Sequence, residues 1–210
     1  MSIEDFVYYQ KSEQGIKDIV KLWNDIKSNY LKETSLYLEW LIWRIILSLG
    51  INKNNPLEIT NTKLDKDFNP ISCAAKELPD LDLLYKNMRI ACEVTERPIP
   101  GYIEHYFHVY NMEKKYKIET FGLLISRLNV EDIIPETWNT YKGRLDSIGP
   151  LFMITDVEFL VKILHIKDNP QKQWDTFIKE SKAIWNENKN WKDIKGGIIS
   201  LQQGIINGGY

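Results

Sequence analysis

The chain has 210 residues, the size of one ordinary domain. Lys and Arg number 27 against 29 for Asp and Glu, so the net charge of −2 excludes the basic excess that grips nucleic acid without sequence preference. No apolar run reaches the roughly 18 residues of a membrane span, the amino terminus lacks a signal-peptide pattern, and two cysteines make a disulfide or zinc framework unexpected. We therefore expect a cytoplasmic protein with no membrane partner.

The first quarter of the chain predicts two helices. Apolar residues three and four apart run through Ser12–Lys32, the pattern of an amphipathic helix. Ser35 can cap a second helix that runs to about Leu49, with Gly50 as its stop. The following segment, Ile51–Leu78, is largely polar and broken by prolines, so we expect mostly loop, with room for one strand.

The rest of the chain predicts both strands and helices. In chain order we expect strands at Asp80–Tyr85 and Met88–Thr95, a helix at Ile103–Lys117, a buried strand at Thr120–Leu128, a helix from a capping box at Thr155 and Glu158 to about His165, and a helix at Gln171–Trp185. The tail Gly196–Tyr210 has no clear pattern. These elements predict a single α/β domain over residues 1–210 with a small mixed sheet, a core at about 35–130, and flanking helices at 12–32 and 155–190.

One acidic residue lies inside an almost wholly apolar helix. Leu36–Leu47 has ten apolar residues out of twelve, and its two charges, Glu39 and Arg44, lie about 140° apart at 100° per residue. A helix of this kind is normally buried, so its charges either reach water at the edge of the core or face a polar site. The segment alone favours a Glu39 that reaches water.

Two of the expected strands predict a pair of carboxylates. If Lys86 and Asn87 form a two-residue turn, opposed residues have numbers that sum to 173, and Asp80 lies opposite Glu93. The register that makes one face apolar then places two like charges about 5 Å apart, which is destabilising without a cation. Carboxylates at this spacing suit Mg²⁺. A solvated acidic edge of the sheet is an equally open interpretation.

Several short motifs occur together around these acids. They are Pro79-Asp80, then Glu93-Val94-Thr95 thirteen positions after Asp80, preceded by Tyr37-Leu38-Glu39-Trp40, Arg44 and Leu49-Gly50. The combination resembles the PD-(D/E)XK signature of restriction-endonuclease-like nucleases, and from Tyr37 to Arg127 it is similar to the small catalytic subunit of heterodimeric type IIS restriction endonucleases. The resemblance implies an α-β-β-β-α-β core, with its first strand between Leu57 and Leu64.

The resemblance also implies a set of site residues. Asp80 and Glu93 would bind Mg²⁺, with Mn²⁺ as a substitute and the main-chain carbonyl of Val94 as a further ligand. Glu39 would lie at the same site. Thr95 takes the place of the signature Lys and cannot act as a cation, although type IIS relatives also have a small polar residue there.

One further acid of the relatives has two candidates here. The relatives carry a Glu before an Arg-His pair, and Glu96 and Glu104, the latter beside His105, compete for that role. Glu104 is included in the expected catalytic set. His105 and His108 are otherwise expected to be surface or structural residues, and Asp82 an outer or solvated group.

The implied function is a Mg²⁺-dependent DNA endonuclease subunit. It would cut one strand of double-stranded DNA, while a larger subunit recognises the sequence and carries a second nuclease site. The metal would polarise a phosphodiester oxygen and lower the pKa of a bound water. Two alternatives are a homodimeric nuclease of the same superfamily, acting in repair or in a mobile element, and a non-catalytic interaction domain.

Overall fold

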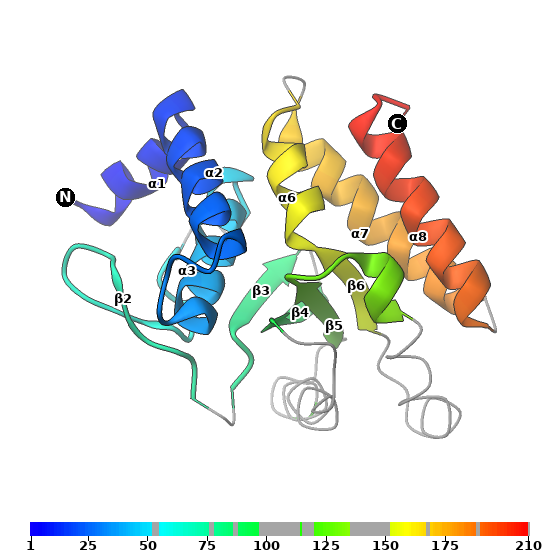
Figure 1. Ribbon diagram of the computed structural model, residues 1–210, viewed down its shortest axis with the longest axis horizontal. Helices are drawn as coiled ribbons and strands as arrows, with labels where there is room; N and C mark the ends of the chain where they lie inside the picture. The colour runs from blue at the N-terminus through cyan, green and yellow to red at the C-terminus, as the bar shows by residue number, and fades with distance from the viewer. Residues whose placement is uncertain are drawn as a thin grey trace.

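The computed structural model describes residues 1–51, 55–75, 78–85, 88–96, 114, 120–134, 152–166, 169–187 and 190–209. Its elements are α1 (Ile3–Lys11), α2 (Glu13–Lys27), α3 (Thr34–Ser48), β1 (Lys63–Leu64), β2 (Pro70–Ser72), β3 (Leu81–Tyr85), β4 (Met88–Thr95), β5 (Thr120–Ser126), β6 (Phe152–Asp156), α6 (Val157–Leu164), α7 (Pro170–Glu187) and α8 (Trp191–Ile206). Figure 1 shows the sheet between α1–α3 on the left and α6–α8 on the right. The predicted α/β fold with a small mixed sheet is confirmed. None of the described helices is long and apolar enough to cross a membrane.

The main sheet has the order β3-β4-β5-β6, and β1 and β2 form a separate antiparallel pair. β4, β5 and β6 are parallel neighbours, whereas β3 is antiparallel to β4. Every residue of β5 is buried, as expected for a central parallel strand covered on both faces. The cross-strand partners from Leu81↔Cys92 to Tyr85↔Met88 confirm the predicted register.

The amino-terminal helices differ from the prediction at their starts. α1 was not expected, and Ser12 ends it and caps α2 by accepting the Gly15 N–H at 3.1 Å. Ser35 lies inside α3 rather than capping it, because the helix starts at Thr34, two residues before the expected first residue Leu36, and its N-cap is Glu33. Gly50 has a φ of 77° just beyond α3, which is the left-handed conformation expected of a helix stop.

The carboxy-terminal third holds two elements that the sequence pattern did not reveal. β6 extends through Thr155, so Asp156 caps α6 and accepts the Phe159 N–H at 2.8 Å; the predicted capping role of Thr155 is wrong. α8 occupies most of the glycine-containing tail. Trp174 and Trp185 of α7 are buried core residues.

Two other expectations concern the centre of the chain. Within the described residues, the segment 57–64 does not form a strand of the main sheet. Thr60 makes only an isolated antiparallel bridge to Leu81, after which the chain turns away into β1. The helix expected at Ile103–Lys117 falls outside the described residues, apart from Lys114, which is helical.

Candidate active site

Asp80 and Glu93 lie side by side at one end of the β3–β4 pair, near the start of β3 and the end of β4. Asp80 directly precedes β3, and the pairing of Leu81 with Cys92 puts it opposite Glu93. Asp80 Oδ2 accepts the Val94 N–H at 2.7 Å, which holds the carboxylate against β4. Glu93 is buried, with 1% of its surface exposed. The folded chain therefore brings two carboxylates together at the end of an edge strand and an interior strand.

The electrostatics of Asp80 reflect this crowding. Its pKa is raised well above the ordinary value, first because the carboxyl loses water on burial and then because of the negative charges of Glu93 and Glu39. The Val94 N–H lowers the pKa in part. All three acids are thus within electrostatic reach, and a cation placed among them would relieve their repulsion.

Glu39 enters the site from α3. It is 7% exposed, and its Oε2 accepts hydrogen bonds from the Thr62 hydroxyl at 2.8 Å and from the Ala74 N–H at 3.0 Å. The interpretation in which Glu39 reaches water at the edge of the core is wrong, because the carboxylate is buried and bound by polar groups. Its charge faces the polar site instead.

The backbone of β4 offers a third oxygen. The Val94 N–H points toward Asp80, whereas the next carbonyl, that of Thr95, accepts the Arg127 N–H at 2.8 Å on the opposite side of the strand. Because peptide groups of successive strand residues alternate in direction, the Val94 carbonyl points to the Asp80 side. Thr95 lies on the same strand face as Glu93.

These oxygens fit Mg²⁺ better than a softer metal. Mg²⁺ is typically bound through one or two carboxylates, with water and substrate phosphates completing its shell. Asp80, Glu93 and the Val94 carbonyl form such an oxygen-only set. No cluster of three or more His, Cys, Asp or Glu side chains placed to hold a metal occurs in the described part of the chain. Glu39 therefore stands beside the pair and does not complete a three-carboxylate cage.

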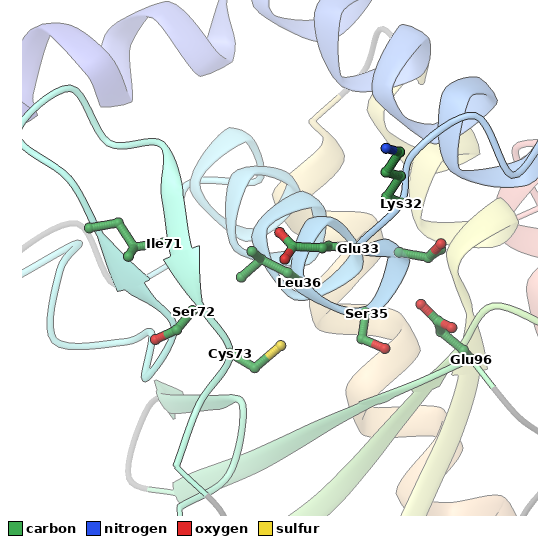
Figure 2. A pocket seen from close by; sticks show the side chains of 9 residues that line it. Lys32, Glu33, Ser35, Leu36, Ile71, Ser72, Cys73 and Glu96 are labelled. Carbon is green, nitrogen blue, oxygen red and sulfur yellow. The ribbon is translucent and has the colours of Figure 1, made fainter.

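An open pocket of about 430 Å³ lies near Glu39 and Asp80, whose charges act on Cys73 in its lining. It is lined by Lys32, Glu33, Thr34, Ser35, Leu36, Ile71, Ser72, Cys73 and Glu96. Figure 2 shows side chains entering it from the start of α3, from the end of β2 and from the end of β4. The Cys73 thiol of this pocket forms a hydrogen bond to Glu39. Desolvation of the thiol, the charge of Glu39 and this hydrogen bond raise the pKa of Cys73 to about 12.

The comparisons with known proteins agree with this geometry. Residues 4–97 match the family described as AlwI restriction endonuclease. The fold matches the crystal structure of the small subunit of the heterodimeric restriction endonuclease R.BspD6I with a TM-score of 0.64 and 18% identity, over 90% of this chain and 98% of that chain. The chain therefore has a restriction-endonuclease-like fold. A comparison with curated protein sequences finds no significant match.

Within the restriction-endonuclease-like fold, the two competing acids have different outcomes. Glu96 follows β4 and lines the pocket, and its Oε1 is buried without a hydrogen-bond partner among the described residues. Glu104 lies outside the described residues, as do His105 and His108. The structure thus places Glu96 at the pocket, and both Glu96 and Glu104 stay predictions for the further acid.

Other acidic and basic residues near the motif are structural. Asp82 receives two bonds of 2.9 Å from Arg89, one to each carboxylate oxygen, so it is engaged along the sheet rather than at the site. Arg44 donates to Gln10 at 2.7 Å and stacks 4.7 Å from the Trp40 ring. Thr62 is one of the residues at the site that the sequence did not predict. It lies in a polar segment without periodicity, and its role depends on a contact 23 residues away along the chain.

Proposed function

We propose that the chain is a Mg²⁺-dependent DNA endonuclease, the catalytic small subunit of a type IIS restriction enzyme. It would cut one strand of double-stranded DNA, and a larger subunit would recognise the sequence and carry the second nuclease site. One observation carries the proposal: Asp80, Glu93 and Glu39 converge at the end of β3 and β4 in a restriction-endonuclease-like fold. The AlwI match and the likeness to a subunit of a heterodimeric enzyme support it.

The site residues have distinct chemical roles in this proposal. Asp80, Glu93 and the Val94 carbonyl would hold Mg²⁺, which supplies positive charge to the phosphodiester in the transition state and acidifies water. Glu39, fixed through Oε2, can orient water or accept a proton. The Thr95 hydroxyl can donate a hydrogen bond to a phosphate oxygen, but it adds no positive charge. Glu96 or Glu104 would add the further acid.

The charge of the chain supports a need for a partner. A net charge of −2 supplies little counterion release on binding a duplex, so most of the affinity for DNA would come from the larger subunit. Cys73 and Cys92 are free thiols, which fits the reducing cytoplasm that we propose as its location.

The test compares two neighbouring acids. Asp80 directly precedes β3, and Asp82 lies within it. Asp80→Asn removes a proposed metal ligand, whereas Asp82→Asn removes a carboxylate that is bound to Arg89. The full chain is mixed with the proposed larger subunit, Mg²⁺ and a plasmid that carries the recognition site. The wild type and Asp82→Asn should break both strands, and Asp80→Asn should leave a nick.

A second measurement does not depend on the partner. Calorimetric titration of the full chain with Mg²⁺ should show binding to the wild type and to Asp82→Asn but not to Asp80→Asn. A wild-type chain that neither binds Mg²⁺ nor contributes to cleavage would instead be a non-catalytic interaction domain. An Asp80→Asn variant that still breaks both strands at the wild-type rate would exclude the assigned site.

A further inference from the structure

The two ends of the β1–β2 pair converge on one oxygen of Glu39. Thr62 directly precedes β1, and Ala74 lies two residues after β2; both donate to Glu39 Oε2, at 2.8 and 3.0 Å. Thr62 is 4% exposed, so water does not readily replace its hydroxyl. The Cys73 thiol adds a weaker hydrogen bond to the same carboxylate. The orientation of Glu39 is therefore set by the β1–β2 segment as well as by its own helix.

The turn between β1 and β2 is hydrogen-bonded to Trp40, the residue that follows Glu39 in α3. The Trp40 indole N–H donates to the Phe68 carbonyl at 2.8 Å, at a point where Phe68 has a φ of 65°. The Phe68 ring also packs on Phe6, with centroids 4.9 Å apart. The segment is thus fixed to Trp40 at its turn and to Glu39 at its base.

We propose that Thr62 is a positioning residue that orients Glu39 for DNA cleavage; this inference rests on the proposed nuclease function. A hydrogen bond to an ionised carboxylate is roughly twice as strong as one between neutral groups, and loss of a partner that orients a site group typically costs about 10–100-fold in activity or metal affinity. The Ala74 donor belongs to the main chain and survives side-chain substitution. Thr62 therefore supplies the strong side-chain donor that can be removed.

The test uses substitutions that separate the hydroxyl from the packing. Thr62→Val keeps the shape and removes the donor, and Thr62→Ser keeps the donor. Both are assayed as full chains with the larger subunit and saturating Mg²⁺, by the rate at which the strand assigned to this chain is cut. Thr62→Val should be at least ~10-fold slower, within the range typical of such partners, and Thr62→Ser should stay near the wild-type rate.

A double-mutant cycle shows whether Thr62 acts through Glu39. In a Glu39→Gln background, Thr62→Val should add little, because the group that it orients is already impaired. A matched control is Thr155→Val, which removes another buried hydroxyl, one that accepts the Gln202 amide at 3.2 Å in β6. The control should lower the melting temperature and leave the cleavage rate unchanged.

The outcomes distinguish the inference from the proposed function. A wild-type rate for Thr62→Val, or an undiminished effect of Thr62→Val in the Glu39→Gln background, would overturn the positioning role and leave the nuclease intact. A wild-type chain without Mg²⁺ binding or cleavage would overturn both. If Thr62→Val loses its helical circular dichroism, Thr62→Ala replaces it in the same comparison.

Discussion

The closest test of the carboxylate pair is the stability of Asp80→Asn without metal. The substitution removes one of the two opposed charges and keeps an amide oxygen that can still accept the Val94 N–H, which is 2.7 Å from Asp80 Oδ2. We therefore expect the variant to be more stable than the wild type in EDTA. Most substitutions at a half-buried polar site would do the reverse.

The magnitude follows from the register of β3 and β4. Opposed residues have Cβ atoms about 5 Å apart, and two unit charges at that distance repel by about 3 kcal/mol at an effective dielectric constant of about 20. Because the pKa of Asp80 is raised, the folded apo protein can take up a proton there and so relieve part of the repulsion between the two carboxylates. A net gain of about 2 kcal/mol raises the melting temperature of a chain this size by about 4–8 °C.

The pH dependence has a definite sign. Because the folded-state pKa of Asp80 is raised, the folded apo protein binds more protons than the unfolded chain once the pH exceeds the ordinary Asp value of 3.8. Stability is therefore lost as the pH rises from 3.8 to the folded-state pKa. The advantage of Asp80→Asn should be largest above that pKa and should narrow as the pH falls toward 3.8.

The assay is thermal unfolding followed by circular dichroism, with EDTA and with Mg²⁺. A ligand at 100 times its dissociation constant stabilises the folded state by about 2.7 kcal/mol, so Mg²⁺ should raise the wild-type melting temperature by about 5–11 °C. Asp80→Asn should gain little, and the order of the two proteins should reverse. An Asp80→Asn variant that is less stable in EDTA and gains as much from Mg²⁺ as the wild type would refute the reasoning.

Three further outcomes are expected. Glu39→Gln should slow strand cleavage by at least ~10-fold with an unchanged circular dichroism spectrum, since transition-state contacts of this kind are worth one or more factors of ten; unaltered turnover would return Glu39 to a structural role. Glu96→Gln should slow cleavage in the same assay if Glu96 is the further acid, whereas a wild-type rate would assign that role to Glu104. In a gel-shift assay at about 0.15 M salt, the isolated chain should not bind duplex DNA sequence-specifically, and tight specific binding would contradict the two-subunit arrangement.

The pairing of Asp80 with Glu93 was predictable because it depends only on residues that are close together in the sequence. A two-residue turn fixes the register of an antiparallel pair, so the opposition of Asp80 and Glu93 follows once the turn is placed, and the observed partners confirm it. The burial of β5 was likewise predictable from its continuous apolar run. The orientation of Glu39 was not, because Thr62 and Ala74 reach it through tertiary contacts that no periodicity encodes.

The missed elements have a similar physical cause. Glycine usually signals the end of a helix, yet Gly197 lies within α8, where a Cβ would come 2.9 Å from the Ile184 Cγ2 of α7. The glycine serves close helix packing there and does not break the helix. In β6, strand pairing with β5 extends through Thr155 to Asp156, so sheet formation overrides the capping signal of Thr155.

The pairing of β4 with β5 has a consequence for protein synthesis. All the carboxylates with a described place at the site are translated before residue 97, but β4 is held along seven positions, from Arg89↔Thr120 to Thr95↔Ser126, by a strand made later. A nascent chain that ends before Thr120 would carry all of these acids, but the edge of β4 that pairs with β5 would still be open. The order of translation therefore delays assembly of the site until the downstream strand has emerged, so an unfinished chain should lack a formed cutting centre.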